Sequence, residues 1–303
     1  MIVEMCNVSF GYKRHYKTIS NISLSVEKGS IYGFIGSNGA GKTTTIKLLL
    51  GLLKPDQGTI KLFSKDFAND YINIYKKVGA LIGKPSLYER LSGRDNLKIQ
   101  QLIRNLPSKK IDEVLQIVNL ENAADSIVKE YSTGMKQRLG IAIALMSDPE
   151  LIVLDEPTNA LDPNGIVEIR ETILRLNKVF NKTIFLSSHL LSEVEKLVTH
   201  LAIIESGSLK FQGSITKLQN LKSKKLNVII ETRDNDRSAS VLSSYSVARE
   251  DDKLTLSVTS KEEIGDVIRL LTDNGITIYQ AYIKKENLED LFFDITQEGA
   301  YVK

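Results

Sequence analysis

The sequence predicts an α/β protein in two parts, a large domain built on a parallel β-sheet and a small α+β domain. A short apolar run over residues 30–35 ends in a glycine-rich turn, and a helical pattern of apolar residues follows it. A second apolar run, 151–154, is continuous, which suits a parallel strand buried on both faces. Residues 219–225 are polar and basic, as in a linker, and alternating apolar residues resume beyond them.

Length and composition are those of an ordinary globular protein. The chain has 303 residues, of which 42% are hydrophobic and 25% are charged, enough for one large domain and a small one. Its formal net charge of +3 is too small to indicate a nucleic-acid or membrane-surface partner. Cys6 is the sole cysteine, which excludes an internal disulfide. We expect no signal peptide, and the longest apolar stretches, 46–53 and 139–146, are shorter than the ~20 residues of a membrane span.

Two short strands are expected before the glycine-rich turn, at 2–10 and 19–27. In the second, apolar residues alternate with polar ones, the period of a half-buried strand. Between the strands, Tyr12 precedes a basic loop. Its ring could stack on an adenine base, a contact worth about 1–3 kcal/mol, although such a tyrosine by itself is more often ordinary packing.

Residues 36–43 match the phosphate-loop pattern G-x-x-x-x-G-K-S/T between a strand and a helix. Small residues let backbone N–H groups turn inward around phosphate oxygens, and the start of the helix adds further donors. Lys42 can reach the β- and γ-phosphates, and the Thr43 hydroxyl can bind Mg²⁺. The loop therefore predicts binding of a nucleoside triphosphate. The predicted binding residues are Gly36, Ser37, Asn38, Gly39, Ala40, Gly41, Lys42, Thr43 and Thr44.

The middle of the chain continues with a turn at 54–58, strands at 59–63 and 78–82, and a mainly helical stretch over 92–146. Ser132 is a good N-cap for the last of these helices. A helix opened by Ser and Gly could hold a second anion. Considered alone, this segment is better explained as a capped core helix.

Asp155 and Glu156 follow the second apolar run at its C-terminal end, where open α/β sheets place ligands. Asp155 can bind Mg²⁺ directly or through water, and Glu156 can act as the general base for an attacking water. A helix is expected up to residue 176 and a buried strand at 183–187, followed by His189. A histidine at a strand end is more often structural, but its place after a phosphate loop and an acidic pair favours a catalytic role.

A hairpin at 201–204 and 208–211 precedes the linker. Beyond the linker the order of expected elements resembles a split β-α-β module. These elements are strands at 226–232 and 254–258, a helix at 262–271, a strand at 276–283 and a terminal helix at 286–295.

Together these residues resemble the ATP-binding subunits of ABC transporters, over roughly residues 1–218. Besides the phosphate loop and the 154–157 element, residues 131–138 look like the family's signature sequence. Asp162 falls in a segment similar to the D-loop, and His189 falls at the switch histidine. Tyr12 matches the adenine-stacking aromatic, with Tyr16 as a lesser candidate.

The resemblance implies a P-loop NTPase fold with a RecA-like core, an antiparallel β subdomain and a helical subdomain. It also implies that two copies close head to tail over two ATP molecules with Mg²⁺. The signature residues then face the γ-phosphate held by the other copy. These residues are Ser132, Thr133, Gly134 and Met135. The resemblance divides the chain into an ABC ATP-binding domain at 1–218, a linker at 219–225 and an α+β accessory domain at 226–303.

The divergent signature and the C-terminal module are similar to those of the drug, bacitracin and lantibiotic-immunity exporter subgroup. The expected function is therefore an ATPase that powers export of an antimicrobial peptide or antibiotic. We expect a separately encoded transmembrane permease as partner, a homodimer on ATP binding, and a cytoplasmic location at the inner face of the membrane. No nucleic-acid partner is expected.

One position departs from the family pattern. The Q-loop, which carries Gln or Glu in the family, should lie in residues 81–88, and Gly83 occupies the polar position. Glycine has no side-chain oxygen for a metal or an attacking water. Glu89 is the nearest carboxylate but lies further along the loop. Coupling to the permease and the rate of ATP turnover are the properties that this departure affects.

Two other classes of function compete with the transport ATPase. An ATP-switched protein of translation, chromosomes or repair shares this domain type. Such proteins usually carry two such domains or a long coiled-coil insertion, and this chain has neither. A regulatory binding role for the C-terminal module is the third reading. A neighbouring gene for a protein with about six apolar spans would decide for the transporter.

Overall fold

The computed structural model describes all residues except 14–16, 221–225, 251, 284–287 and 298–303. The chain divides into two compact units, one of residues 1–215 with 292–303 and one of residues 216–291. No helix among the described residues combines the length and the apolar character needed to cross a lipid bilayer.

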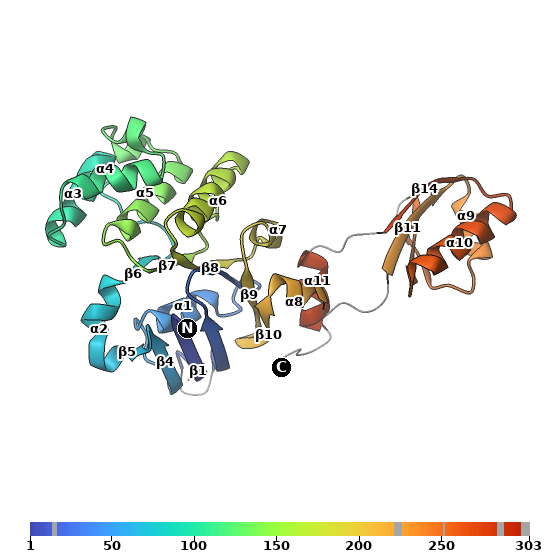
Figure 1. The fold of residues 1–303 in the computed structure, drawn as a ribbon, viewed down its shortest axis with the longest axis horizontal. Coiled ribbons are helices and arrows are strands. Elements are labelled where there is room, and N and C mark those ends of the chain that lie inside the picture. Colours follow the sequence, from blue (N-terminus) through green and yellow to red (C-terminus); the bar gives the residue numbers. More distant parts are fainter. Residues whose placement is uncertain (14–16, 221–225, 251, 284–287, 298–303) are drawn as a thin grey trace. The chain divides into compact units, whose positions relative to one another are not determined.

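The centre of the first unit is a six-stranded sheet in the order β10-β9-β3-β8-β7-β6 (Figure 1). Its strands are parallel except β10, which pairs antiparallel with β9. Every residue of β3 and β7 is buried, as expected for parallel strands covered on both faces. The strands are β3 (Ile31–Ile35), β6 (Val78–Leu81), β7 (Leu151–Asp155), β8 (Thr183–Ser188), β9 (His200–Glu205) and β10 (Ser208–Ser214). The apolar runs at 30–35, 151–154 and 183–187 and the predicted hairpin are thus confirmed as strands.

A second, antiparallel sheet has the order β2-β1-β4-β5. Its strands are β1 (Val3–Phe10), β2 (Ile19–Val26), β4 (Gln57–Leu62) and β5 (Lys65–Asp66). Apolar side chains of this sheet, of the six-stranded sheet and of α1 (Lys42–Leu49) form one core, including Val8, Ile22 and Ile46, each with 0% exposure. This core anchors α1, the helix that follows the phosphate loop.

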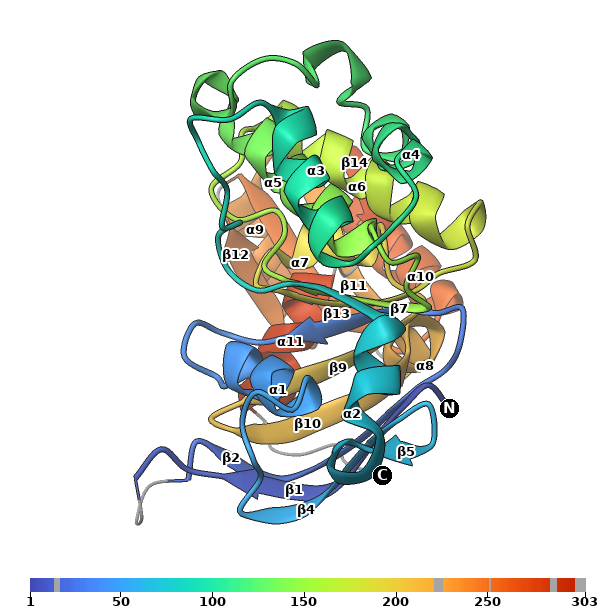
Figure 2. The same ribbon diagram turned by 90° about the vertical axis from the view of Figure 1, so that its left-hand side faces the viewer.

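Helices α3 (Gly93–Ile103), α4 (Lys109–Ile117), α5 (Thr133–Leu145) and α6 (Pro163–Lys178) gather in the upper part of this unit (Figure 2). Short 3-10 turns at Glu121–Ala123 and Val128–Glu130 separate α4 from α5. Helix α2 (Phe67–Lys76) lies between the strands predicted at 59–63 and 78–82 and was not predicted. The short helices α7 (Leu191–Glu195) and α8 (Ile215–Asn220) were also missed. The arrangement confirms the P-loop NTPase fold.

The second unit contains a four-stranded antiparallel sheet in the order β12-β13-β11-β14, with α9 and α10 packed against it. Its core includes Ile230, Leu256 and Leu271. The elements are β11 (Leu226–Thr232), α9 (Asn235–Val241), β12 (Val247–Glu250), β13 (Lys253–Val258), α10 (Lys261–Asp273) and β14 (Ile278–Ile283). The next helix in the chain, α11 (Leu288–Gln297), falls from residue 292 onward in the first unit. Helix α9 and strand β12 were not predicted, because the stretch between β11 and β13 is mostly polar. The observed order is β-α-β-β-α-β, which has one helix and one strand more than the order expected from the sequence.

Candidate nucleotide-binding site

The phosphate loop joins β3 to α1 in the predicted strand–loop–helix order. A Cβ at Gly36 would lie 2.4 Å from the carbonyl oxygen of Ile204, so only glycine fits. Gly41 has a φ of 109°, a left-handed conformation that L side chains rarely adopt. The Lys42 ammonium donates hydrogen bonds to the Gly36 oxygen (2.7 Å) and the Ser37 oxygen (3.1 Å). Lys42 is therefore folded over the carbonyls of its own loop.

Thr43 and Asp155 meet at the C-terminal edge of the sheet. The Thr43 hydroxyl donates to Asp155 Oδ2 at 2.8 Å, and the Ser187 hydroxyl donates to Asp155 Oδ1 at 2.7 Å. The Thr43 hydroxyl and the Asp155 carboxylate are oxygen ligands of the kind that Mg²⁺ uses together with substrate phosphates and water. No group of three or more potential metal-binding His, Cys, Asp or Glu side chains occurs among the described residues.

Glu156 lies between two basic side chains. Its Oε1 is 3.1 Å from the Lys42 ammonium, and its Oε2 is 2.7 Å from His189 Nδ1. Its backbone N–H donates to the Ser187 hydroxyl, and its φ of 51° is left-handed. Such a conformation in a non-glycine residue costs free energy and requires the surrounding contacts to hold it. The left-handed backbone at Glu156 thus directs its carboxylate toward Lys42 of the phosphate loop.

These residues line a cavity of about 330 Å³. Its lining includes the loop residues 38, 39 and 41–44, together with Glu156 and His189. The other residues predicted for nucleotide or metal binding are not among the lining residues, namely Tyr12, Gly36, Ser37, Ala40 and Asp155. Two further lining residues, Thr18 and Asn159, were missed. The sequence signal for Asn159 was its place three residues after Glu156. In the structure its N–H donates to the Glu156 carbonyl at 3.1 Å, which keeps it beside the acidic pair. Thr18 carried no such signal.

Tyr12 lies beside the start of α1. Its hydroxyl is 3.4 Å from Thr44 Oγ1, and its ring packs edge-on against Phe10 at 5.0 Å between centroids. The side chain is 58% exposed, so a ring face is accessible to a flat ligand. Its role in stacking adenine stays a prediction. Tyr16, the lesser candidate, lies outside the described residues.

The signature residues and Asp162 do not belong to the set that lines this cavity. Ser132 caps α5, with its hydroxyl accepting from the Met135 N–H at 3.2 Å, and both Ser132 and Thr133 are exposed. Asp162 caps α6 by accepting from the Gly165 N–H at 3.1 Å. Gly134 is buried, and its ideal Cβ would lie 3.6 Å from Gly165 Cα. One helix start thus packs against the other.

Gly83 follows β6 with a φ of 64°. Apart from its chain neighbours, no atom of the described residues lies within 4 Å of an ideal Cβ at this position. The space is open, but the backbone conformation favours glycine. Glu89 does not approach the site, since it pairs with Lys136 at 2.7 Å, and this neighbour holds the pKa of the Glu89 carboxyl below its usual range.

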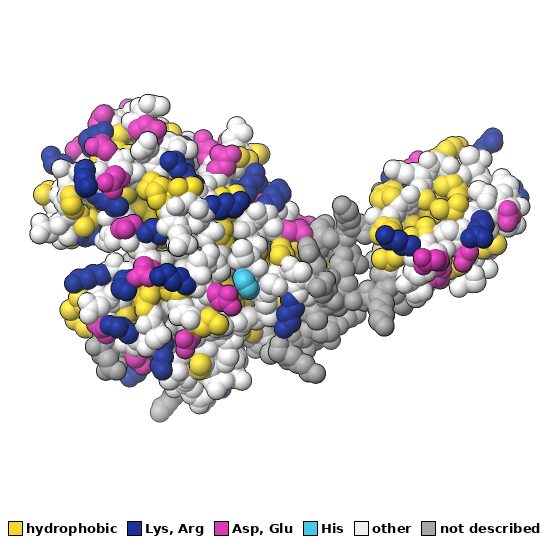
Figure 3. Space-filling view, in the orientation of Figure 1, with side chains coloured by type: hydrophobic (Ala, Val, Ile, Leu, Met, Phe, Trp, Pro, Cys, Tyr) yellow, Lys and Arg dark blue, Asp and Glu magenta, His cyan; other side chains and the backbone are white. Residues whose placement is uncertain are grey.

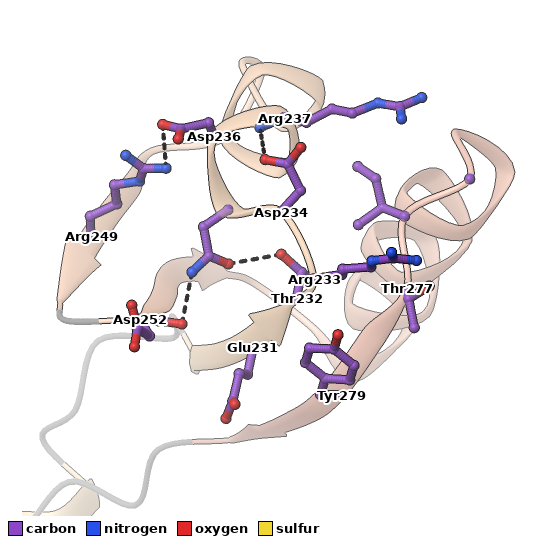
Figure 4. A pocket seen from close by; sticks show the side chains of 13 residues that line it. Glu231, Thr232, Arg233, Asp234, Asp236, Arg237, Arg249, Asp252, Thr277 and Tyr279 are labelled. Atoms are coloured by element: carbon purple, nitrogen blue, oxygen red, sulfur yellow. Dashed lines mark hydrogen bonds and ion pairs between the residues drawn. The ribbon is translucent and has the colours of Figure 1, made fainter.

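A second cavity, of about 820 Å³, lies in the C-terminal unit (Figure 4). Arg249 pairs with Asp236 at 2.6 Å, and Asn235 connects the Thr232 hydroxyl (2.8 Å) to the Asp252 carbonyl (2.7 Å). These contacts fix the start of α9 to the turn between β12 and β13. None of the residues predicted from the sequence as functional lies here.

Comparison with known proteins agrees with this geometry. The family model described as "ABC transporter" matches residues 19–159. The chain is 38% identical to the bacitracin transport ATP-binding protein of Bacillus licheniformis, covering 93% of this chain and 94% of that protein. It is 40% identical to a lantibiotic transport ATP-binding protein of Streptococcus pyogenes, covering 67% of this chain and 87% of that protein. A solved ATP-binding subunit of an ABC transporter aligns with a TM-score of 0.64 and 27% identity, covering 73% of this chain and 93% of that one.

Proposed function

This chain belongs to the ABC transporter family as an ATP-binding subunit that couples ATP hydrolysis to transport, and we propose that it powers export of an antimicrobial peptide or antibiotic. The proposal of cargo rests on the relatives named for bacitracin and lantibiotic transport, the first of which matches the chain over nearly its whole length. The membrane path then comes from a separately encoded permease. We place the subunit at the cytoplasmic face of the membrane through that permease, and we propose this as its location.

The observation that carries the proposed chemistry is the cluster of Lys42, Glu156 and His189. When a triphosphate occupies the loop, its γ-phosphate competes for the Lys42 ammonium, and Glu156 loses one partner. The Glu156 carboxylate is then available to take a proton from a water aligned with the γ-phosphate. His189, held on Oε2, keeps that carboxylate oriented. Tyr12 is the proposed contact for the adenine ring.

Thr43 and Asp155 are the residues that would hold Mg²⁺. When bound, this ion supplies positive charge that offsets the charge developing on the phosphate oxygens. The Ser187 hydroxyl orients the Asp155 carboxylate from the opposite side, so that Oδ2 faces Thr43.

Two copies of the chain complete the site. The exposed residues Ser132 and Thr133 stand at the start of α5, where backbone N–H groups favour an anion. We propose that they bind the γ-phosphate held by the other copy, together with Gly134 and Met135, and that Asp162 shapes the adjacent loop. A nucleic-acid role is less well supported, because basic and acidic side chains are interspersed over the described residues in the view of Figure 3.

Glu156→Gln tests this function. Loss of a general base costs about 10²–10⁴-fold in rate, while the phosphate loop and its lysine are unchanged. We expect the variant to bind ATP, to hydrolyse it slowly, and to sediment as a dimer with ATP and Mg²⁺. A monomer at saturating ATP would contradict the paired-site proposal. For the cargo, the wild type co-expressed with its permease should raise resistance to bacitracin or a lantibiotic, and Glu156→Gln should not. An active ATPase that protects against none of these peptides would contradict the cargo.

A further inference from the structure

Strand β6 and the loop that follows it run along one face of α5. The contacts fall on Lys136, Gly140 and Ala144 of the helix, each four residues from the next. Residues spaced by four lie on the same side of an α-helix. The three contacts therefore form one straight seam that ends a single turn from the start of α5.

Two of the contacts bring backbone directly against backbone or a rigid ring. A Cβ at Gly79 would lie 2.3 Å from the Ala144 carbonyl oxygen. A Cβ at Gly140 would lie 2.8 Å and 2.9 Å from Cγ and Cβ of Pro85. The proline ring thus occupies the space where a side chain of residue 140 would stand. Neither partner is a flexible side chain, so the fit fixes the position of α5 relative to β6.

The third contact lies next to the signature residues. Glu89 pairs with Lys136 at 2.7 Å, and the Lys136 N–H donates to the Ser132 carbonyl at 3.0 Å. On its other side β6 pairs with β7, where Leu81 lies opposite Leu154, the residue before Asp155. Strand β6 therefore connects the strand that carries the acidic pair to the helix that carries Ser132.

We propose that this seam sets the position of the signature residues, and that Gly140 and Lys136 are positioning residues for ATP turnover. The inference rests on the proposed function, in which Ser132 and Gly134 act on the nucleotide of the other copy. Gly83 itself has no side chain that could contact the nucleotide. Packing along α5 connects the loop to the signature residues.

Gly140→Ala tests the seam. The new Cβ must move from 2.8 Å to an ordinary contact of at least 3.4 Å, a displacement of 0.6 Å or more. A displacement of about 1 Å at a reacting centre can cost about 10²-fold in rate, so we expect about a tenfold loss of kcat. Affinity of the monomer for a fluorescent ATP analogue should not change, because residue 140 does not line the cavity. Gly265→Ala, a helical glycine with only Arg269 Nη2 at 3.9 Å, is the matched control and should keep full activity.

The decisive measurement is dimer formation. In a Glu156→Gln background with ATP and Mg²⁺, adding Gly140→Ala should weaken dimerisation about tenfold by sedimentation, and adding Gly265→Ala should not. Pro85→Gly removes the two nearest atoms and leaves the end of the flexible Leu81 side chain at 3.1 Å. Gly140→Ala with Pro85→Gly should therefore dimerise better than Gly140→Ala alone. Glu89→Lys and Lys136→Glu should each weaken dimerisation about two- to fivefold, the range expected for an exposed ion pair, and the exchanged pair should recover it.

The outcomes separate the two proposals. If Glu156→Gln forms no dimer with ATP, the paired site of the proposed function is wrong. If it forms a dimer that Gly140→Ala leaves unchanged, the seam proposal alone is wrong. A third outcome is that Gly140→Ala lowers ATP affinity or melting temperature along with activity, and that neither Pro85→Gly nor the charge exchange restores dimerisation. The residues then stabilise the fold without positioning the signature residues, and the seam proposal is also wrong.

Discussion

A side chain at position 83 is expected to have two opposing effects on the protein, and comparing Gly83→Gln with Gly83→Ala separates them. The sequence predicts that Gly83→Gln returns an oxygen near the metal and speeds hydrolysis by about tenfold, which corresponds to ~1.4 kcal/mol of barrier. The φ of 64° predicts a cost, because an L side chain in this conformation loses about 1 kcal/mol relative to glycine. Both effects apply to Gly83→Gln. Only the cost applies to Gly83→Ala, which is therefore the reference variant.

We expect both variants to unfold at a temperature about 2–4 °C below the wild type, since ~1 kcal/mol shifts the midpoint by that amount in a domain of this size. Neither side chain should clash, because the space around the ideal Cβ is open. ATP hydrolysis with Mg²⁺ should be about tenfold faster in Gly83→Gln than in Gly83→Ala. Equal rates in the two variants would refute the reasoning that a carboxamide oxygen is what this loop lacks.

Three further substitutions address the remaining contacts. Lys42→Ala should weaken nucleotide binding, because the phosphates lose their nearest point charge, and a titration that finds unchanged affinity would remove Lys42 from the site. His189→Ala should lower kcat at least tenfold without changing ATP affinity, and a wild-type rate would show that the ring is structural. Lys196, and then Arg170, hold the pKa of Glu193 below its usual value, so this carboxylate stabilises the fold above about pH 4.5 and loses that effect as the pH falls. Glu193→Gln should therefore be less stable by about 0.5 kcal/mol at pH 7, with the difference from wild type shrinking in urea melts toward pH 4.

The phosphate loop could be recognised from the sequence because its chemistry is local. Gly36 and Gly41 are required by close approach and by a left-handed φ, so the motif and the backbone determine each other. The place of Asp155 and Glu156 at the end of a buried strand could be predicted because the run before them is fully apolar. The contact between Lys42 and Glu156 could not be predicted as a distance, because it depends on the pairing of β3 with β8 and of β8 with β7.

The misses have different physical causes. Helix α9 begins with Asn235 and contains Ser and Asp, residues with low helix propensity, so its formation depends on the Asp234 cap and on packing. Helix α2 ends only two residues before β6, and its apolar residues merged with the strand in the pattern. At Gly83 the sequence left two readings open, a lost ligand or a required turn. The φ of 64° supports the required turn. It does not bear on the second reading, in which the position has lost a side-chain oxygen ligand.

The role of the signature residues could not be deduced from the structure of one copy of the chain. Ser132 already satisfies one N–H at the start of α5, so the helix is complete by itself and its residues look like an ordinary cap. Ser132 and Thr133 are exposed, and in the proposed paired site a second copy brings a phosphate to them. In that proposal the position of α5 affects the paired site, whereas no residue of α5 lines the cavity of the monomer. This is why substitutions along its seam should alter dimer formation and kcat, and should leave the affinity of the phosphate loop for ATP unchanged.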